Sequence, residues 1–315
     1  MNCTHIAGQI TGRRNRGFSL LELMVAMVIL LSVAGIVMSG LMQTAWTEGM
    51  VANRTEMHAS VRSATELLQQ EIGQAGAVAL PAAVTLSAAV TTTGSSSSVA
   101  VSSTTGMFAN ELLLVDTGVN QETVTVTAVS SSTITAIFSN THASGVPVTL
   151  PGGFGTGIVP PTVNGMTNGS TGSLLKLYGD VNNDGNMQYV EYTCDTAGGN
   201  LYRNAMSFSA SSKPALTSAM VLLPNIQSNP SGTACFTYQV KPTGCSGSSC
   251  FVTDVAVTLT VQTQQKDPQT GQYQTETKAL LNVSPRNVFD TWELNSASVT
   301  NRIQPMPASV TSLLP

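Results

Sequence analysis

An uncharged run of 20 residues, 23–42, constrains this chain more than any other feature of its sequence. A helix needs about 20 mainly apolar residues to span the hydrocarbon core of a bilayer. Arg13, Arg14 and Arg16 precede the run, and the next charge after it is Glu48. Because basic residues favour the cytoplasmic side, we expect one membrane-spanning helix with its leader inside and the rest of the chain exported.

Glu22 lies at the entrance to this run and argues against an ordinary secretory signal. Such signals have an apolar stretch of about 7 to 15 residues, which is shorter than the one here. An acid in a membrane helix costs about 2.5 to 3.5 kcal/mol unless it finds a partner. Arg13 and Arg14 also suggest a twin-arginine signal, although the surrounding residues fit that pattern poorly. We therefore expect Glu22 to have a specific role.

The residues around Glu22 resemble the cleavage and methylation signature of type IV prepilins and type II pseudopilins. The matching stretch is Arg16-Gly17-Phe18-Ser19-Leu20-Leu21-Glu22, followed by an apolar run. The resemblance implies that a prepilin peptidase cuts between Gly17 and Phe18 and that the new amino group of Phe18 is methylated. It also implies that the Glu22 carboxylate meets the positively charged N-terminus of a neighbouring subunit in a filament.

The second half of the predicted helix has an amphipathic pattern. Apolar residues recur there at spacings of three and four, namely Met57, Val61, Ala64, Leu68, Ile72 and Ala75. The pattern predicts one apolar stripe, and Pro81 is expected to end the helix, which would then cover about residues 18–78. From residue 173 onward, short β-rich runs predict an antiparallel sheet, with long strands at 255–261 and 273–283. Since stripe and sheet each need an apolar partner, we expect an α+β fold of the type IV pilin kind.

Composition shifts along the chain divide it into six segments. Residues 85–150 contain short β-rich runs separated by Gly, Ser and Asn turns, and they loosely resemble small β-barrel-like modules of bacterial and phage surface proteins. The expected segments are the leader 1–17, the transmembrane and assembly helix 18–78, the inserted β-rich module 85–150, a Gly, Pro and Asn-rich linker 151–172, the C-terminal β-sheet pilin domain 173–295 and a tail 296–315.

Two short segments resemble PilW-type minor pilins. Residues 67–76 form an acidic, glutamine-rich helix end followed by Ala-Gly, and residues 283–287 place Arg-Asn after a strand. This resemblance implies a minor pilin that primes pilus assembly near the tip, in a system for adhesion, motility or DNA uptake. Its partners would be the prepilin peptidase, other major and minor pilins, the pilus assembly platform and the inner membrane. The precursor would span the inner membrane once, with its globular domain in the periplasm. The mature protein would then move into the pilus at the cell surface. A minor pseudopilin of a type II secretion system remains the alternative.

An extracellular enzyme anchored in the membrane is a less favoured alternative. The exported part contains two histidines, His58 and His142, and no G-x-S-x-G, H-E-x-x-H or Walker sequence. The formal charge of the chain is −4, and no basic patch is available to neutralise phosphates. We therefore expect a protein that is not an enzyme and does not bind nucleic acid.

The cysteines predict disulfides. One of the five, Cys3, lies in the leader, and the other four suit two disulfides in an oxidising compartment. Four cysteines allow three pairings. We favour Cys245 with Cys250, which would close a tight Ser-Gly loop, and Cys194 with Cys235, which would join separated strands.

Residues 180–191 fit the calcium-loop pattern D-x-[DN]-x-[DN]-G-x5-E at every specified position. The pattern predicts ligands from Asp180, Asn182, Asp184, Asn186, Gln188 and Glu191. The flanking runs indicate strands instead of helices, so Gln188 and Glu191 are the less secure ligands. A metal-free hairpin turn with Gly185 at positive φ is the alternative. Extracellular sites of this type bind calcium at about 10⁻⁴ to 10⁻³ M.

Overall fold

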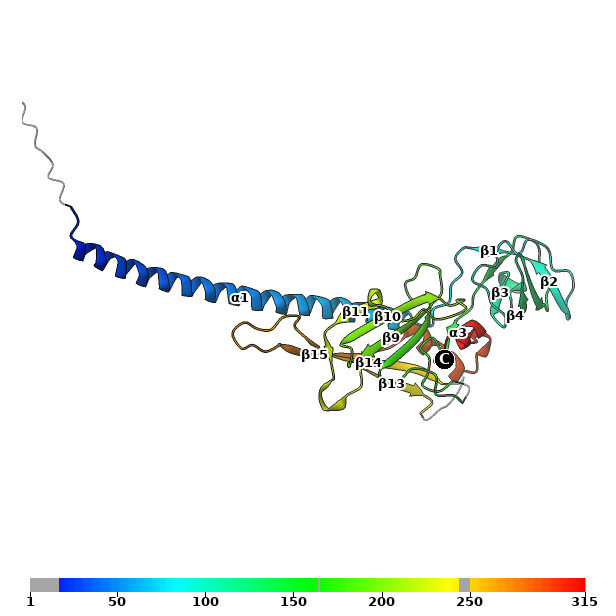
Figure 1. The fold of residues 1–315 in the computed structure, drawn as a ribbon. Coiled ribbons are helices and arrows are strands. Elements are labelled where there is room, and N and C mark those ends of the chain that lie inside the picture. The colour runs from blue at the N-terminus through cyan, green and yellow to red at the C-terminus, as the bar shows by residue number, and fades with distance from the viewer. Residues whose placement is uncertain (1–16, 164, 244–249, 315) are drawn as a thin grey trace, which may run out of the picture. The chain divides into compact units, whose positions relative to one another are not determined.

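The computed structural model describes residues 17–163, 165–243 and 250–314 (Figure 1). The leader arginines and Cys245 therefore lie outside the described residues. The chain divides into two compact units. The first consists of residues 1–52 with 267–272, and the second of residues 53–266 with 273–315. Every sheet formed by the described residues lies in the second unit.

Helix α1 runs from Leu20 to Gln74, so it ends four residues before the predicted position. Gly76 ends it by adopting a φ of +83°, a conformation that glycine takes without steric cost. A Cβ at this position would lie 2.7 Å from the carbonyl oxygen of Phe154. The N–H of Gly76 donates to the carbonyl of Tyr178 at 2.9 Å. The helix therefore ends where its backbone joins a sheet, and the prediction that Pro81 ends it was wrong.

The predicted combination of a long helix and antiparallel β-structure is confirmed, but the strands between residues 173 and 283 form two sheets in place of the one predicted. The first has the order β11-β10-β9-β8. Its strands are Val221–Pro224, Asn200–Ser207, Gln188–Asp195 and Leu174–Gly179. The second has the order β12-β14-β13, with β15 also paired to β14. Strand β12 is Ile226–Gln227, β13 is Phe236–Lys241, β14 is Phe251–Gln262 and β15 is Thr275–Val283.

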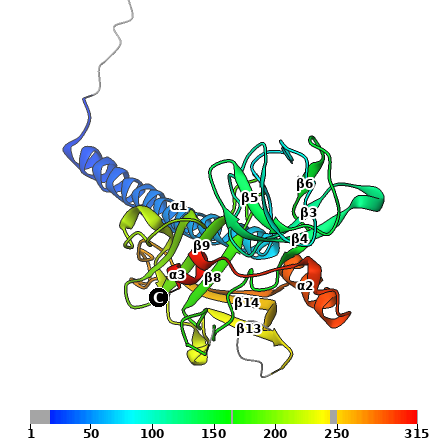
Figure 2. The same ribbon diagram turned by 90° about the vertical axis from the view of Figure 1, so that its right-hand side faces the viewer.

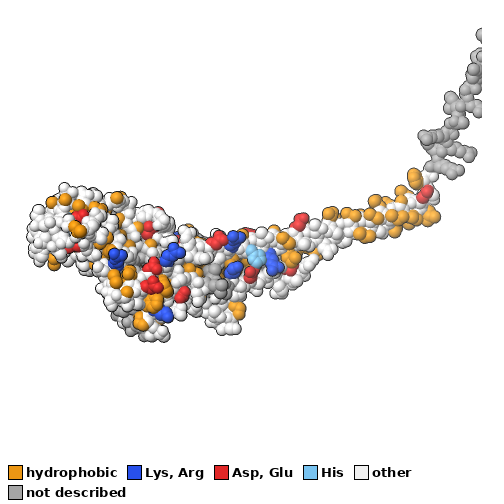
Figure 3. All heavy atoms as spheres, turned by 180° about the vertical axis from the view of Figure 1, so that it is seen from behind, with side chains coloured by type: hydrophobic (Ala, Val, Ile, Leu, Met, Phe, Trp, Pro, Cys, Tyr) orange, Lys and Arg blue, Asp and Glu red, His pale blue; other side chains and the backbone are white. Residues whose placement is uncertain are grey.

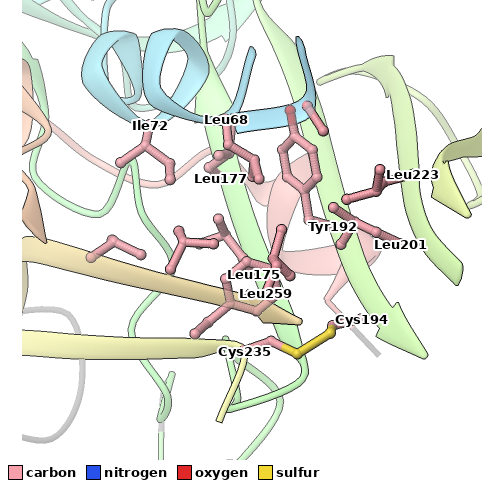
Figure 4. Close-up of a cluster of buried hydrophobic side chains, with 14 of the residues drawn as sticks. Leu68, Ile72, Leu175, Leu177, Tyr192, Cys194, Leu201, Leu223, Cys235 and Leu259 are labelled. Atoms are coloured by element: carbon pink, nitrogen blue, oxygen red, sulfur yellow. A yellow bond between two sulfur atoms is a disulfide. The ribbon is translucent and has the colours of Figure 1, made fainter. Parts of the chain in front are cut away.

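The apolar stripe of α1 packs on both sheets, as its periodicity predicts. All six residues of the stripe are buried. Figure 4 shows Leu68 and Ile72 pointing into a cluster that includes Leu177 of β8 and Leu259 of β14. A fully buried leucine or isoleucine contributes about 1.5 to 3 kcal/mol. The stripe therefore fixes residues 57–75 firmly to the sheets.

The other face of the β8–β9 sheet is also buried, because the C-terminal residues cover it. Tyr178 and Tyr189 lie there in one cluster with Phe154, Val310 and Leu313. Strand β7 (Gly153–Phe154) pairs in parallel with β16 (Ile303–Gln304), and helix α3 (Ala308–Leu313) follows. Helix α2 (Arg286–Ser296) was not predicted from the sequence. The predicted tail is thus an integral part of the domain.

Residues 84–149 form a small closed barrel (Figure 2). Its strands follow the order β1-β6-β3-β4-β5-β2. Strand β1 is Val84–Thr85, β2 is Ser96–Ala100, β3 is Leu112–Val115, β4 is Glu122–Val129, β5 is Thr133–Ile137 and β6 is Pro147–Thr149. A bridge between Leu86 and Val101 joins the two edges and closes the barrel. Closure removes the exposed sheet edges on which other strands could pair.

Candidate functional site

The N-terminal end of α1 presents its motif residues without partners among residues 17–163, 165–243 and 250–314. The first helical hydrogen bond runs from the N–H of Leu23 to the carbonyl of Ser19. Glu22 lies in the first turn, where the helix dipole favours a carboxylate. Among the described residues it forms no hydrogen bond or ion pair. Phe18 is 85% exposed. Both side chains are therefore available to groups from outside this chain.

The apolar half of α1 suits a lipid or protein environment better than water. By length and composition α1 is long and apolar enough to cross a membrane, and its apolar part is not buried against the rest of the chain that the structure describes. Its hydrophobic side chains cover the first part of the helix in Figure 3. The hydroxyls of Ser32, Ser39, Thr44 and Thr47 donate to carbonyls of the same helix. These four hydroxyls therefore need no water as a hydrogen-bond partner.

A buried ion pair fixes the other end of α1 to the first sheet. Glu71 is 2% exposed, and its two carboxylate oxygens accept from the Nε of Arg203 at 3.0 and 3.1 Å. The hydroxyl of Tyr192 donates to the same carboxylate. Burial alone would lower the pKa of Arg203, but Glu71 outweighs it and raises that pKa. Sequence reasoning missed this contact, because Glu71 and Arg203 are 132 residues apart.

The predicted calcium loop forms a turn that is stabilised by its own hydrogen bonds. Asp180 Oδ1 accepts from the N–H of Asp184 and Oδ2 from the N–H of Gly185, both at 3.0 Å. Asp184 Oδ1 accepts from the N–H of Asn186 at 2.8 Å, and that bond is the main reason why the pKa of Asp184 lies below its usual value. Gly185 has a φ of +84°. These are the features of the hairpin alternative, yet each carboxylate oxygen keeps a further lone pair for a cation.

The last two predicted ligands lie on β9 and are not part of this turn. Gln188 pairs in register with Gly179 and Ser207. Glu191 Oε1 accepts from the Tyr189 hydroxyl at 2.7 Å and from Lys213 Nζ at 2.9 Å, and Lys176 Nζ lies 3.7 Å away. Glu191 would have to leave three partners to bind a cation. In the described parts of the chain, no three His, Cys, Asp or Glu side chains form a metal-binding group.

The predicted disulfide between Cys194 and Cys235 is present. It links β9 of the first sheet to the residue before β13 of the second, and both cysteines are buried (Figure 4). Cys250 is also disulfide-bonded. Its predicted partner, Cys245, lies outside the described residues, so that pairing stays a prediction.

A buried histidine holds two acids together inside the barrel. His142 Nδ1 lies 3.1 Å from Asp116 Oδ2, and Nε2 lies 2.7 Å from Glu122 Oε1. The imidazole is completely buried. The hydrogen bond to His142 is the main cause that holds the pKa of Asp116 below its usual value. Burial would raise the pKa of Glu122, but His142 and two backbone N–H groups outweigh it. These residues stabilise the barrel and leave no ring nitrogen free for chemistry.

Comparison with known proteins supports the N-terminal motif. Residues 12–38 match the family model described as the prokaryotic N-terminal methylation motif. No curated protein and no solved structure matches the chain. The matched segment includes Gly17, Phe18 and Glu22 and ends well before the sheets.

Proposed function

We propose that this chain, whose N-terminus is that of a type IV prepilin, is a minor subunit of a type IV pilus. The observation that carries the proposal is the methylation motif at the start of a helix whose first half is unburied. The motif implies cleavage by a prepilin peptidase, membrane anchoring and later assembly with other pilins. The second half of the same helix holds the folded domain through its stripe and Glu71.

The inserted barrel supports a minor role of the PilW type near the pilus tip. A subunit that is repeated along the whole shaft has little use for a separate module, whereas a subunit present in few copies can present one. The module contains no Lys or Arg, and its surface is rich in Ser and Thr. We place its role in assembly and display, not in catalysis or nucleic-acid binding.

A minor pseudopilin of a type II secretion system shares the same motif and helix. Purification of the tagged chain from its native membrane, with chemical cross-linking, separates the two. Recovery of pilus tip proteins and pilus assembly components supports the proposal. Recovery of type II secretion components in their place contradicts it.

Replacing Gly17 by valine is expected to block maturation almost completely. A peptidase needs an unshielded backbone at the cut, and a branched side chain covers it. Immunoblots of membranes should show the full-length precursor in place of the shorter mature form. Gly35→Val is the control, because Gly35 also has open space around its Cα but lies outside the cleavage site. Mature Gly17→Val protein in normal amounts would disprove this cleavage site.

Replacing Glu22 by alanine is expected to permit cleavage but to reduce recovery in sheared filaments by at least tenfold. The methylated amine of a neighbouring subunit would be buried without its counter-charge. Glu48→Ala is the control, since Glu48 lies on the same helix outside the motif. The measurement is an immunoblot of the sheared fraction against the membrane fraction. Equal recovery of the Glu22→Ala and parent proteins would rule out the pairing.

We further propose that calcium binds the turn through Asp180, Asn182 and Asp184, without Glu191. With this reduced ligand set, the affinity should lie near the weak end of the range, about 10⁻³ M. At 5 mM calcium, binding at that strength stabilises the fold by about 1 kcal/mol, or about 2 to 4 °C in Tm.

Thermal unfolding of the full chain in detergent, with calcium or with chelator, tests this site. Asp184→Ala should abolish the calcium-dependent rise in Tm. Asp195→Ala should retain it, because Asp195 caps a different turn by accepting from the N–H of Gly198. If calcium fails to raise the Tm of the parent protein, the metal-free hairpin is the correct description.

A further inference from the structure

A side chain of the C-terminal segment forms hydrogen bonds that join the barrel to the sheets. Gln304 Oε1 accepts from the N–H of Leu112 at 2.9 Å, and Gln304 Nε2 donates to the carbonyl of Leu112 at 2.8 Å. The same Nε2 donates to the carbonyl of Pro151 at 3.1 Å. Gln304 is 2% exposed. One carboxamide thus links β3 of the barrel to β16 and to the chain that leaves the barrel.

An aromatic contact completes this joint. Phe108, from the loop before β3, has its ring centroid 5.9 Å from that of Phe154 and 6.1 Å from that of Phe208. Phe154 and Phe208 belong to the cluster on the second face of the β8–β9 sheet. The joint therefore consists of an apolar contact and a hydrogen-bonded contact on either side of residues 109–111.

Glu111 lies between these two contacts and has no adequate partner for a negative charge. It is fully buried. Its Oε2 accepts one long bond of 3.4 Å from the N–H of Phe108, and its Oε1 has no partner among the described residues. An ionised carboxylate in such a place is strongly disfavoured unless it is paired. Water would reach Glu111 if the joint opened.

No charged group in the described part of the chain compensates for this burial. Burial raises the pKa of Glu111 to about 8, and only the Phe108 N–H acts against it. The titratable groups on the described elements packed around the joint form no hydrogen bond or ion pair with Glu111, and none of them contributes to its pKa shift. They are Asp116, Glu122 and His142 of the barrel, Lys176, Tyr178, Tyr189 and Glu191 of β8 and β9, Arg286, Asp290 and Glu293 of α2, and Arg302 before β16.

We propose that the joint between the barrel and the sheets is a pH-graded latch, which opens more readily as rising pH favours an ionised Glu111 in water. The direction follows from proton linkage. In the closed joint Glu111 keeps its proton up to a pH of about 8, whereas in the open joint it behaves as an ordinary carboxyl with a pKa of 4.5. The closed form is therefore fully favoured below pH 4.5 and loses that advantage as pH rises to about 8. Over this interval the opening equilibrium rises about tenfold for each pH unit, and above it the increase stops.

Hydrogen exchange of the full chain in detergent, followed by mass spectrometry from pH 5 to pH 8, tests the latch. After correction for intrinsic exchange rates, protection of peptides over 108–115 and 303–306 should fall about tenfold per pH unit in the parent protein. Peptides from β14 should show no such fall. In Glu111→Gln, which keeps the shape of the side chain but cannot ionise, protection at the joint should not vary with pH.

A second variant keeps the test decisive if Glu111→Gln does not fold. Gln304→Ala removes the hydrogen bonds of the Gln304 carboxamide to Leu112 and Pro151 but retains Glu111. The amides of the joint should therefore exchange faster at every pH, while their protection falls with pH as steeply as in the parent protein. The latch is disproved if the parent protein and Glu111→Gln share one slope, or if the joint of the parent protein shows none. An equal slope in β14 also disproves it, because Glu111 would then reach water only through global unfolding.

Discussion

Replacing Glu71 by alanine is expected to lower the free energy of unfolding by about 3 to 5 kcal/mol, because removal of one partner leaves a buried charge uncompensated. The guanidinium of Arg203, three-quarters buried, would lose its carboxylate, and the buried Tyr192 hydroxyl would lose its acceptor. For a domain of this size the change corresponds to a fall in Tm of about 10 °C. Thermal unfolding of the purified chain in detergent measures it.

Glu66→Ala provides the matched control for this experiment. Glu66 lies on the same helix and also forms an ion pair with an arginine, Arg62, at 2.7 Å. Both of these side chains are exposed, and such pairs contribute little to stability. The Tm of Glu66→Ala should equal that of the parent protein. Equal Tm values for Glu71→Ala and Glu66→Ala would show that α1 is held by its apolar stripe alone.

Replacing His142 by alanine is expected to destabilise the barrel by on the order of 3 kcal/mol. The change removes a fully buried ring and leaves Asp116 and Glu122 without their shared donor.

Acid should weaken the parent barrel in a related way. Since the folded-state pKa values of both acids lie below the ordinary 3.8 and 4.5, their contribution is present above that range and is lost as pH falls through the lowered values.

Hydrogen exchange within β3 and β4 of the full chain measures the loss in the His142 variant. His58→Ala is the control, because His58 also pairs with one acid, Glu276, but both side chains are more than one-third exposed. The control should leave protection in the barrel unchanged. Normal protection of β3 and β4 in His142→Ala would show that the apolar interior of the barrel suffices.

The elements predicted best are those whose signal is local. The stripe from Met57 to Ala75 follows from helical periodicity. The strands predicted at 255–261 and 273–283 correspond to β14 and β15. Helix α2 was missed because it contains few strong helix formers and directly follows Pro285. Strand β10 was missed because polar residues interrupt its alternation.

Contacts between distant segments could not be predicted. The spacing of residues 180–191 favours Glu191 as a twelfth ligand, but strand pairing determines where that side chain goes. Glu191 lies opposite Lys176 in the β8–β9 register, on the face of the sheet that the C-terminal residues cover. The ion pair of Glu71 with Arg203 and the hydrogen bonds of Gln304 to Leu112 depend in the same way on tertiary packing.

The two ends of the barrel lie side by side, because Val84 and Val148 are paired in the first and last strands and Ala77 bridges to Gly153 just outside them. An insertion that leaves and returns at one point changes neither the register of the flanking strands nor the path of the main chain. Its loop-closure cost also grows only slowly with length. In evolution, such a site permits one module to be exchanged for another while the membrane helix and sheets are kept. For protein engineering, residues 84–149 mark a position at which an unrelated domain with neighbouring termini can be grafted onto the same scaffold.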